Sequence, residues 1–193
     1  MSNKYYVLVY NPPWAGPVPR EIVSAGGGFL KGFKLSSVDS NAKYILEVDE
    51  KAKKTLDYPP LDYFMSSDLV VFFSEKLKTV LNSIGVDNVD YYQVEVTYAP
   101  TNELIKYDLA NVIGSLKSID RDNSIFVEGR RRHIRSVEKM VLDESSFEKF
   151  KLFRCSEFPT LLIINDLVKE VLEENKITGM KIVDPSNWQV SMV

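Results

Sequence analysis

The sequence predicts an α+β fold in which a mixed, largely antiparallel sheet carries two equivalent strand–helix units. One observation is a short apolar run over residues 69–73 that leads into a helical stripe, and the same order returns over 160–175. A second is that segments between these units alternate apolar and polar residues, which is the period of half-buried strands. Strands flanked by such units favour helices packed on a mixed sheet.

The first strand–helix unit begins with the run 69–73, whose uninterrupted apolar residues indicate a strand covered on both faces. Ser74 is typical of a helix N-cap, and Gly85 is typical of a residue that ends a helix. Between them, apolar residues recur at the spacing of one helix face. The residues of this stripe are Leu77, Val80, Leu81 and Ile84.

The second unit repeats this order near the C-terminal end. The apolar run 161–164 replaces the first run, and Asn165 takes the place of Ser74 at the start of the helix. The equivalent stripe consists of Val168, Val171 and Leu172. The segment 177–179 then turns the chain into a strand over 180–183. We therefore expect residues 69–84 and 160–175 to be equivalent and both stripes to be buried.

The remaining segments read as strands separated by turns. Because four prolines remove backbone donors from residues 11–19, this segment predicts a loop. Gly26-Gly27-Gly28 lacks the flanking strand and spacing of a phosphate-binding loop and predicts a turn. Short turns between consecutive strands favour an antiparallel meander. The expected strands cover residues 4–10, 43–50, 92–98, 105–113 and 125–127, with a further apolar segment at 137–142.

Length and charge restrict the class of protein. We expect a single domain over 1–193, with a strand and loop region over 1–56 and a core over 57–193. The net charge of −3 argues against a dedicated nucleic-acid binder. No apolar stretch reaches the length of a membrane-spanning helix, no signal peptide is evident, and one cysteine allows no internal disulfide. These features predict a cytoplasmic protein without membrane partners.

Few residues suggest chemistry. The run Arg130-Arg131-Arg132-His133 is either a solvated hairpin edge or a patch for an acidic protein surface, and we expect no sequence-specific binding of nucleic acid there. Cys155 follows Arg154, which could lower the pKa of its thiol, but a small hydrophobe beside a strand is the favoured interpretation. His133 is the sole histidine, which excludes a multi-histidine metal site. We predict no catalytic residue, cofactor or metal.

Two stretches resemble a known family. The unit Asp68-Leu-Val-Val-Phe-Phe-Ser-Glu-Lys-Leu and the closing Leu152-Phe153-Arg154, followed by the unit from Thr160 to Gly179, carry the resemblance. Together with Lys106-Tyr107-Asp108 and Ile119-Asp120, they resemble the eleventh immunity-protein family of bacterial polymorphic-toxin and type VI secretion systems, formerly a domain of unknown function. The resemblance covers roughly residues 57–183.

This resemblance implies a non-catalytic protein that binds and neutralises a cognate toxin by direct contact. Tight protein inhibitors use a few buried aromatic or arginine anchors. Two alternatives remain open: a self-associating scaffold or adaptor, with a homodimer as its simplest form, and a small ligand-binding or enzymatic domain. Candidate toxin-binding anchors are Trp14, Tyr58, Tyr63, Arg130 and Arg131.

Overall fold

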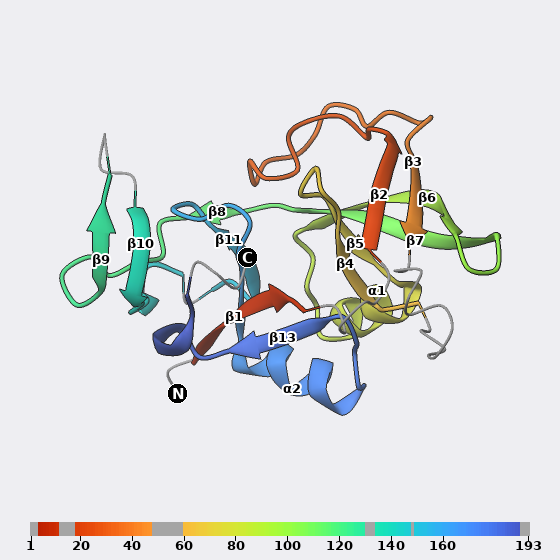
Figure 1. Cartoon of the computed structure of the whole chain (residues 1–193). Helices are drawn as coiled ribbons and strands as arrows, with labels where there is room; N and C mark the ends of the chain where they lie inside the picture. The colour runs from red at the N-terminus through yellow and green to blue at the C-terminus, as the bar shows by residue number, and fades with distance from the viewer. Residues whose placement is uncertain (1–3, 12–17, 48–59, 130–133, 148, 190–193) are drawn as a thin grey trace.

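A computed structural model describes residues 4–11, 18–47, 60–129, 134–147 and 149–189. Its strands form two main sheets and a separate hairpin, with the six-stranded sheet and the hairpin at opposite ends of the molecule (Figure 1). The α+β class with mixed, largely antiparallel strands is confirmed, although the strands are divided between sheets. The parallel pairs are β3 with β6 and β8 with β11.

The five-stranded sheet has the order β13-β1-β12-β11-β8, and the six-stranded sheet has the order β2-β3-β6-β7-β5-β4. The strands of the first are β1 (Tyr5–Tyr10), β8 (Ser115–Leu116), β11 (Leu152–Cys155), β12 (Leu162–Asn165) and β13 (Met180–Val183). Those of the second are β2 (Val18–Val23), β3 (Lys43–Glu47), β4 (Tyr63–Met65), β5 (Val71–Phe73), β6 (Val89–Tyr98) and β7 (Glu103–Val112). The hairpin pairs β9 (Ile125–Glu128) with β10 (Ile134–Lys139).

The two strand–helix units are equivalent in topology as well as in sequence pattern. Helix α1 (Glu75–Ser83) connects β5 to β6, and both strands lie antiparallel to β7, which separates them. Helix α2 (Asp166–Glu174) connects β12 to β13, and both lie antiparallel to β1. The predicted equivalence is therefore confirmed, with one unit in each sheet.

The helix ends of the two units also correspond. The Ser74 hydroxyl accepts a hydrogen bond from the Leu77 amide at 3.1 Å, and the Asn165 side chain accepts one from the Val168 amide at 3.0 Å. Both are N-caps that satisfy an otherwise unpaired amide. After the helices, Gly85 has φ 69 and Lys176 has φ 51. Both helices are thus followed by a residue in the left-handed backbone conformation, although only the first unit uses glycine there.

Three hydrophobic clusters alternate with the two sheets. The central cluster joins residues of both sheets with both helices, and Leu77, Leu81, Val168 and Leu172 are all buried in it. A second cluster lies on the other side of the five-stranded sheet and includes hairpin residues and Trp188. The third lies on the far side of the six-stranded sheet, where Ala25 and Phe29 from the long loop after β2 contribute to it.

Several strand boundaries differ from the prediction, and two of these differences have a clear physical cause. Strand β5 begins at Val71 rather than Leu69, because Leu69 has φ 63 and its amide donates to the Ser66 carbonyl at 2.9 Å in a turn. Strand β2 begins at Val18, so the predicted loop over 11–19 is wrong at its end. Pro19 is tolerated there because β2 is the edge strand of its sheet and pairs on one side with β3.

Residues of the N-terminal region are built into both sheets. Strand β1 lies between β12 and β13, and Val7 pairs with Ile163 on one side and with Val183 on the other. Strand β3 extends the six-stranded sheet beside β6, with Tyr44 and Leu46 buried. These pairings connect the beginning of the chain with strands from its middle and its end.

Candidate functional site

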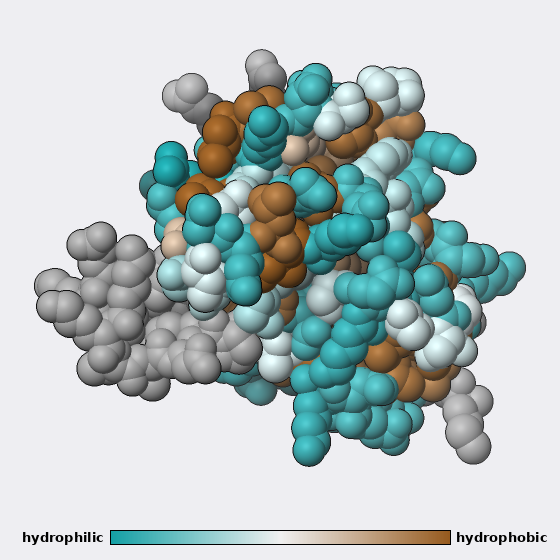
Figure 2. Space-filling model, turned by 90° about the vertical axis from the view of Figure 1, so that its right-hand side faces the viewer, coloured by the Kyte–Doolittle hydropathy of each residue, from teal (hydrophilic) through white to brown (hydrophobic). Residues whose placement is uncertain are grey.

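Apolar side chains reach the surface at the end of the molecule that carries β2, β3 and the β6–β7 hairpin. Figure 2 looks onto this end and shows brown apolar groups among teal polar ones. Two large aliphatic side chains are exposed there: Ile22 on β2 is 55% exposed, and Leu104 on β7 is 65% exposed. Both line the same cavity.

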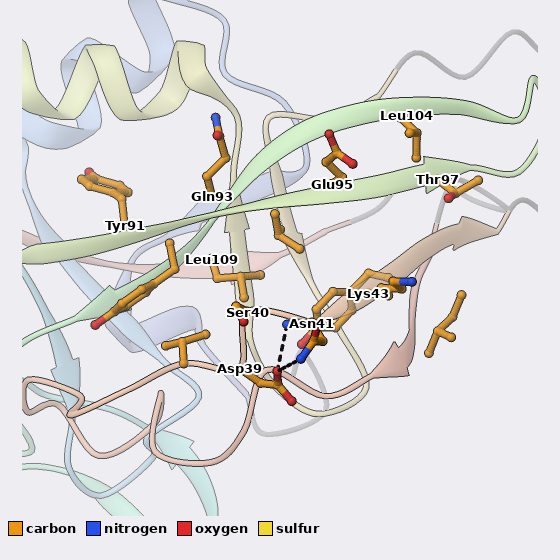
Figure 3. Close-up of a pocket in the computed structure, with 16 residues that line it drawn as sticks. Asp39, Ser40, Asn41, Lys43, Tyr91, Gln93, Glu95, Thr97, Leu104 and Leu109 are labelled. Carbon is orange, nitrogen blue, oxygen red and sulfur yellow. Dashed lines mark hydrogen bonds between the residues drawn. The ribbon is translucent and has the colours of Figure 1, made fainter.

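This cavity is a groove of about 870 Å³ between β6 and the loop over 38–42. In Figure 3 the strands β6 and β7 cross above the loop, and the side chains of Tyr91, Gln93 and Glu95 point to the face of the sheet away from the loop. Six of the lining residues come from β6 alone, namely Tyr91, Tyr92, Gln93, Val94, Glu95 and Thr97. A groove of this size, lined by both apolar and polar residues, is suited to binding.

The loop wall of the groove is held in place by hydrogen bonds. The Asp39 amide donates to the Ala25 carbonyl at 3.1 Å, and the Ala42 amide donates to the Asp39 carbonyl at 3.1 Å. The Asp39 carboxylate accepts from the Asn41 amide at 2.8 Å and from its side chain at 3.2 Å (Figure 3). These bonds close a turn that leads directly into β3, so the wall continues the sheet.

Two tyrosines of the groove lining have buried hydroxyls. Burial raises the pKa of Tyr91 to about 12, and the ammonium of Lys78 lies 5.1 Å from its ring centroid. Burial also raises the pKa of Tyr44, next to the carboxylate of Asp68, to which the Tyr44 hydroxyl donates at 3.2 Å. Both hydroxyls therefore belong to the packed interior beside the groove and are not groups exposed to a bound partner.

The rim of the groove carries charges of both signs with an excess of acid. Asp39 and Glu95 are acidic, whereas Lys43 is basic, and all three are exposed. Val94 and Leu109 form part of an apolar floor, because they belong to the buried cluster under the loop. The groove therefore offers an apolar base and a mainly acidic rim.

Tyr63 is the single predicted anchor that falls within the described residues. It is 1% exposed and packs against the rings of Tyr10 and Phe73 at centroid distances of 6.2 and 5.9 Å. Burial raises its pKa to about 12. Its prediction as a surface anchor is wrong, because β4 pairs with β5 and directs this ring into the central cluster.

The other predicted anchors lie outside the described residues. Trp14 and Tyr58 belong to the ranges 12–17 and 48–59, and Arg130 and Arg131 belong to 130–133. The arginines connect β9 to β10 in the sequence. On the hairpin itself, the apolar side chains of Ile125 and Val127 are exposed.

Cys155 has the surroundings of a structural cysteine. It is buried in β11, and burial, together with the nearby carboxylate of Glu157, raises the pKa of its thiol to about 12. The neighbouring Arg154 is itself buried, and its guanidinium donates to the Pro159 carbonyl at 2.9 Å. The interpretation of Cys155 as a small buried hydrophobe is confirmed.

Sequence patterns did not reveal the groove. The alternation along β6 correctly predicts a half-buried strand, and Val94 and Val96 are buried as expected. The polar residues that alternate with them, Gln93 and Glu95, read simply as a solvated face. The groove forms because the loop over 38–42 lies beside the edge of β6, and this tertiary arrangement leaves no local signal in the sequence.

Comparisons with known proteins agree with the expected family. Within the described ranges, no helix is long and apolar enough to span a membrane. No curated protein matches the chain. The sequence model of the Imm11 immunity protein family matches residues 9–186, so the match includes β2, β3 and the last two residues of β1 beyond the expected 57–183. The chain belongs to the Imm11 immunity protein family.

Proposed function

We propose that this chain is an immunity protein that binds a cognate bacterial toxin by direct contact and neutralises it without catalysis. The observation that carries the proposal is membership of the Imm11 family over residues 9–186. The match includes both strand–helix units and the loop over 38–42 that walls the groove. The protein would act in the cytoplasm of the bacterium that makes the toxin, within a polymorphic-toxin or type VI secretion system.

The groove supports this proposal because its chemistry is suited to recognition of another protein. Protein interfaces combine an apolar centre with a polar rim. The exposed side chains of Ile22 and Leu104 and the rim residues Asp39, Lys43 and Glu95 provide both. A docked partner would cover these apolar side chains, which is favourable in water.

The predicted anchors outside the described residues remain part of the proposal. If Trp14, Tyr58, Arg130 or Arg131 lies at the centre of the interface, its alanine variant should lose about 2 kcal/mol or more of binding free energy. Thermal unfolding of each variant should match the unsubstituted protein. A set of four variants that all bind normally would remove these residues from the interface.

The experiment that tests the function uses the toxin whose gene adjoins that of this chain. Cells that express the toxin alone should die, whereas cells that co-express this protein should survive, and the two proteins should co-purify. Survival without a complex would favour an enzyme that modifies the toxin or repairs its damage. Absence of protection would contradict the immunity function.

Self-association is tested with the same preparations. Light scattering of the purified chain, alone and with toxin, gives the mass of each species. Stable homodimers that persist when the toxin is bound would be compatible with immunity. Homodimers that form in the absence of any toxin binding would favour a scaffold instead.

A further inference from the structure

Strand β6 has one open edge along the groove. On one side it pairs with β7 over its whole length, from Val89 to Tyr98. On the other side β3 pairs only with Val96–Tyr98. Among the described residues, no strand pairs with Val89–Glu95 on that side, because the chain before β3 turns away into the loop over 38–42.

The direction of the backbone groups follows from the register. The Ile113 amide donates to the Asn88 carbonyl at 2.8 Å, so even-numbered residues of β6 face β7 in this uninterrupted antiparallel ladder. Odd-numbered residues face the opposite side, as the bond from the Ala99 amide to the Leu46 carbonyl at 3.0 Å confirms. The amide and carbonyl groups of Tyr91 and Gln93 therefore point into the groove.

The open edge and the loop wall together suit a single extended chain. An extended segment can add to a sheet edge through main-chain hydrogen bonds, while side chains on alternate positions give specificity. The groove has the loop over 38–42 as its far wall, so the edge is reached along a slot. A second copy would bring its own β6, which carries Asp90 and Glu95 but no basic residue and so does not suit the mainly acidic rim.

The lining residues indicate the chemistry of that chain. The side chains of an added strand alternate between the two sheet faces. On one face they would meet the apolar floor at Val94 and Leu109, and on the other they would lie beside Glu95. The rim carries two acidic residues, Asp39 and Glu95, and one basic residue, Lys43. It therefore favours a basic residue of the bound segment over an acidic one.

We propose that the open edge of β6 binds one extended segment of the toxin as an additional strand, with apolar residues toward Val94 and Leu109 and a basic residue beside Glu95. This inference rests on the proposed immunity function. It assigns a main-chain binding mode to the groove, whereas the function itself requires only that the toxin bind somewhere on the protein.

Hydrogen exchange gives the first test. In the full-length chain alone, the Tyr91 and Gln93 amides should exchange fast, and in the complex with the neighbouring toxin they should become at least roughly tenfold slower, as expected for amides that gain a partner. A complex in which both amides still exchange fast would overturn the edge-pairing mode and leave the immunity function intact. Slow exchange that grows with the concentration of the chain alone would assign the edge to a second copy and also overturn the proposal.

A matched pair of variants at Gln93 tests the main chain separately from the side chain. Gln93→Pro removes the amide that faces the groove, and no bond to β7 is lost because that amide points away from β7. Toxin affinity should fall roughly tenfold or more. Gln93→Ala keeps the amide and should bind as the unsubstituted chain does. Equal affinities of the two variants, with unchanged thermal unfolding, would contradict the proposal.

Two charge-reversal variants test the chemistry of the bound segment without a change in the backbone of this chain. Glu95→Lys should weaken toxin binding, and Lys43→Glu should strengthen it, each by roughly three- to tenfold at low salt and less at high salt. Stronger toxin binding by Glu95→Lys together with weaker binding by Lys43→Glu would contradict a basic segment. If no toxin complex forms with any variant or with the unsubstituted chain, the proposed function and this inference fail together.

Discussion

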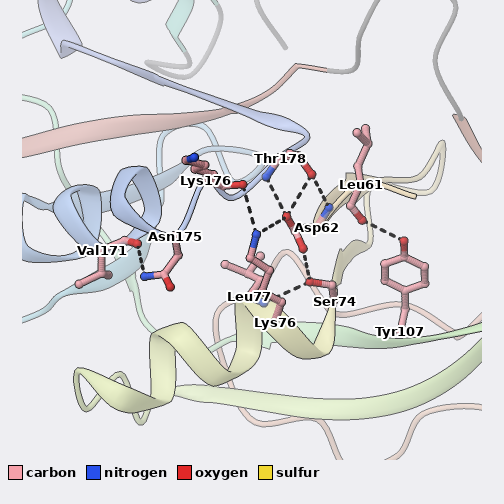
Figure 4. Close-up of polar contacts among 10 residues, drawn as sticks. All are labelled: Leu61, Asp62, Ser74, Lys76, Leu77, Tyr107, Val171, Asn175, Lys176 and Thr178. Carbon is pink, nitrogen blue, oxygen red and sulfur yellow. Dashed lines mark hydrogen bonds and ion pairs between the residues drawn. The ribbon is translucent and has the colours of Figure 1, made fainter. Parts of the chain in front are cut away.

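At the scale of single residues, Asp62 joins the two strand–helix units (Figure 4). One carboxylate oxygen accepts from the Ser74 hydroxyl at 2.7 Å, and the other accepts from the amide and hydroxyl of Thr178, each at 3.0 Å. The Lys76 ammonium lies 3.7 Å from the same carboxylate. The N-cap of α1 is thereby connected to the turn after α2. Gly179 completes the junction, because a Cβ there would lie 2.1 Å from the Tyr63 carbonyl oxygen.

Removal of the Thr178 hydroxyl should destabilise the fold. Thr178→Val keeps the shape of the side chain but leaves Asp62 with fewer donors, and the expected loss is about 1–3 kcal/mol of unfolding free energy. The matched control is Thr101→Val, since the exposed Thr101 hydroxyl donates to Glu103 within a hairpin turn. Chemical denaturation compares the two. If both variants lose an equally small amount of unfolding free energy, the junction at Asp62 contributes no more to stability than a surface turn does.

A second residue-scale prediction concerns pH. The pKa of Asp184 is lowered from 3.8 by a hydrogen bond from Ser186 and then by Lys4, whose ammonium lies 3.1 Å from the carboxylate. A lowered pKa means that the folded state favours the charged form, so this stabilisation is present above pH 3.8 and is lost as the pH falls through the folded-state pKa.

The variant Asp184→Asn should therefore have a lower Tm than the unsubstituted protein at pH 7, and the difference should narrow toward pH 3 or below. Thermal unfolding across this range measures it. If the Tm difference between Asp184→Asn and the unsubstituted protein stays constant with pH, the charge of Asp184 does not stabilise the folded state as assigned here.

At the scale of elements, the strand–helix units were predictable because their signals are local. Cap residues and the spacing of Leu77 and Leu81 are readable from a few neighbouring positions. The start of β2 was not, because Pro19 opposes a strand in any local reading and is accepted only where the sheet ends. The surface role assigned to Tyr63 failed for the same reason, since strand pairing outside its own segment decides its burial.

Both helix stripes should contribute similarly to stability. Leu81 and Leu172 are buried in the central cluster and border the same small void, so Leu81→Ala or Leu172→Ala should each cost about 2–5 kcal/mol. The matched control is Leu167→Ala on α2, because Leu167 is 39% exposed. Its effect should stay within about 0.5 kcal/mol. A cost for either buried leucine as small as that of Leu167 would contradict the equivalence of the two units in the core.

At the scale of the whole molecule, the fold places one strand–helix unit in each sheet and packs both helices into one shared core. The class of fold could be predicted from the sequence, but the division into two sheets could not, because it depends on pairing between β1 and strands near the other end of the chain. The groove depends likewise on β3 and β6, whose residues are far apart in the sequence.

Titration of toxin activity tests direct neutralisation most directly. Increasing amounts of the purified protein are added to a fixed amount of the toxin encoded beside it, and the remaining toxin activity is measured after a set time. A protein that acts by occupying its target should abolish activity at a fixed molar ratio, with no further loss on longer incubation. Complete loss of activity at a small fraction of that ratio, increasing with time, would show turnover and contradict neutralisation by binding.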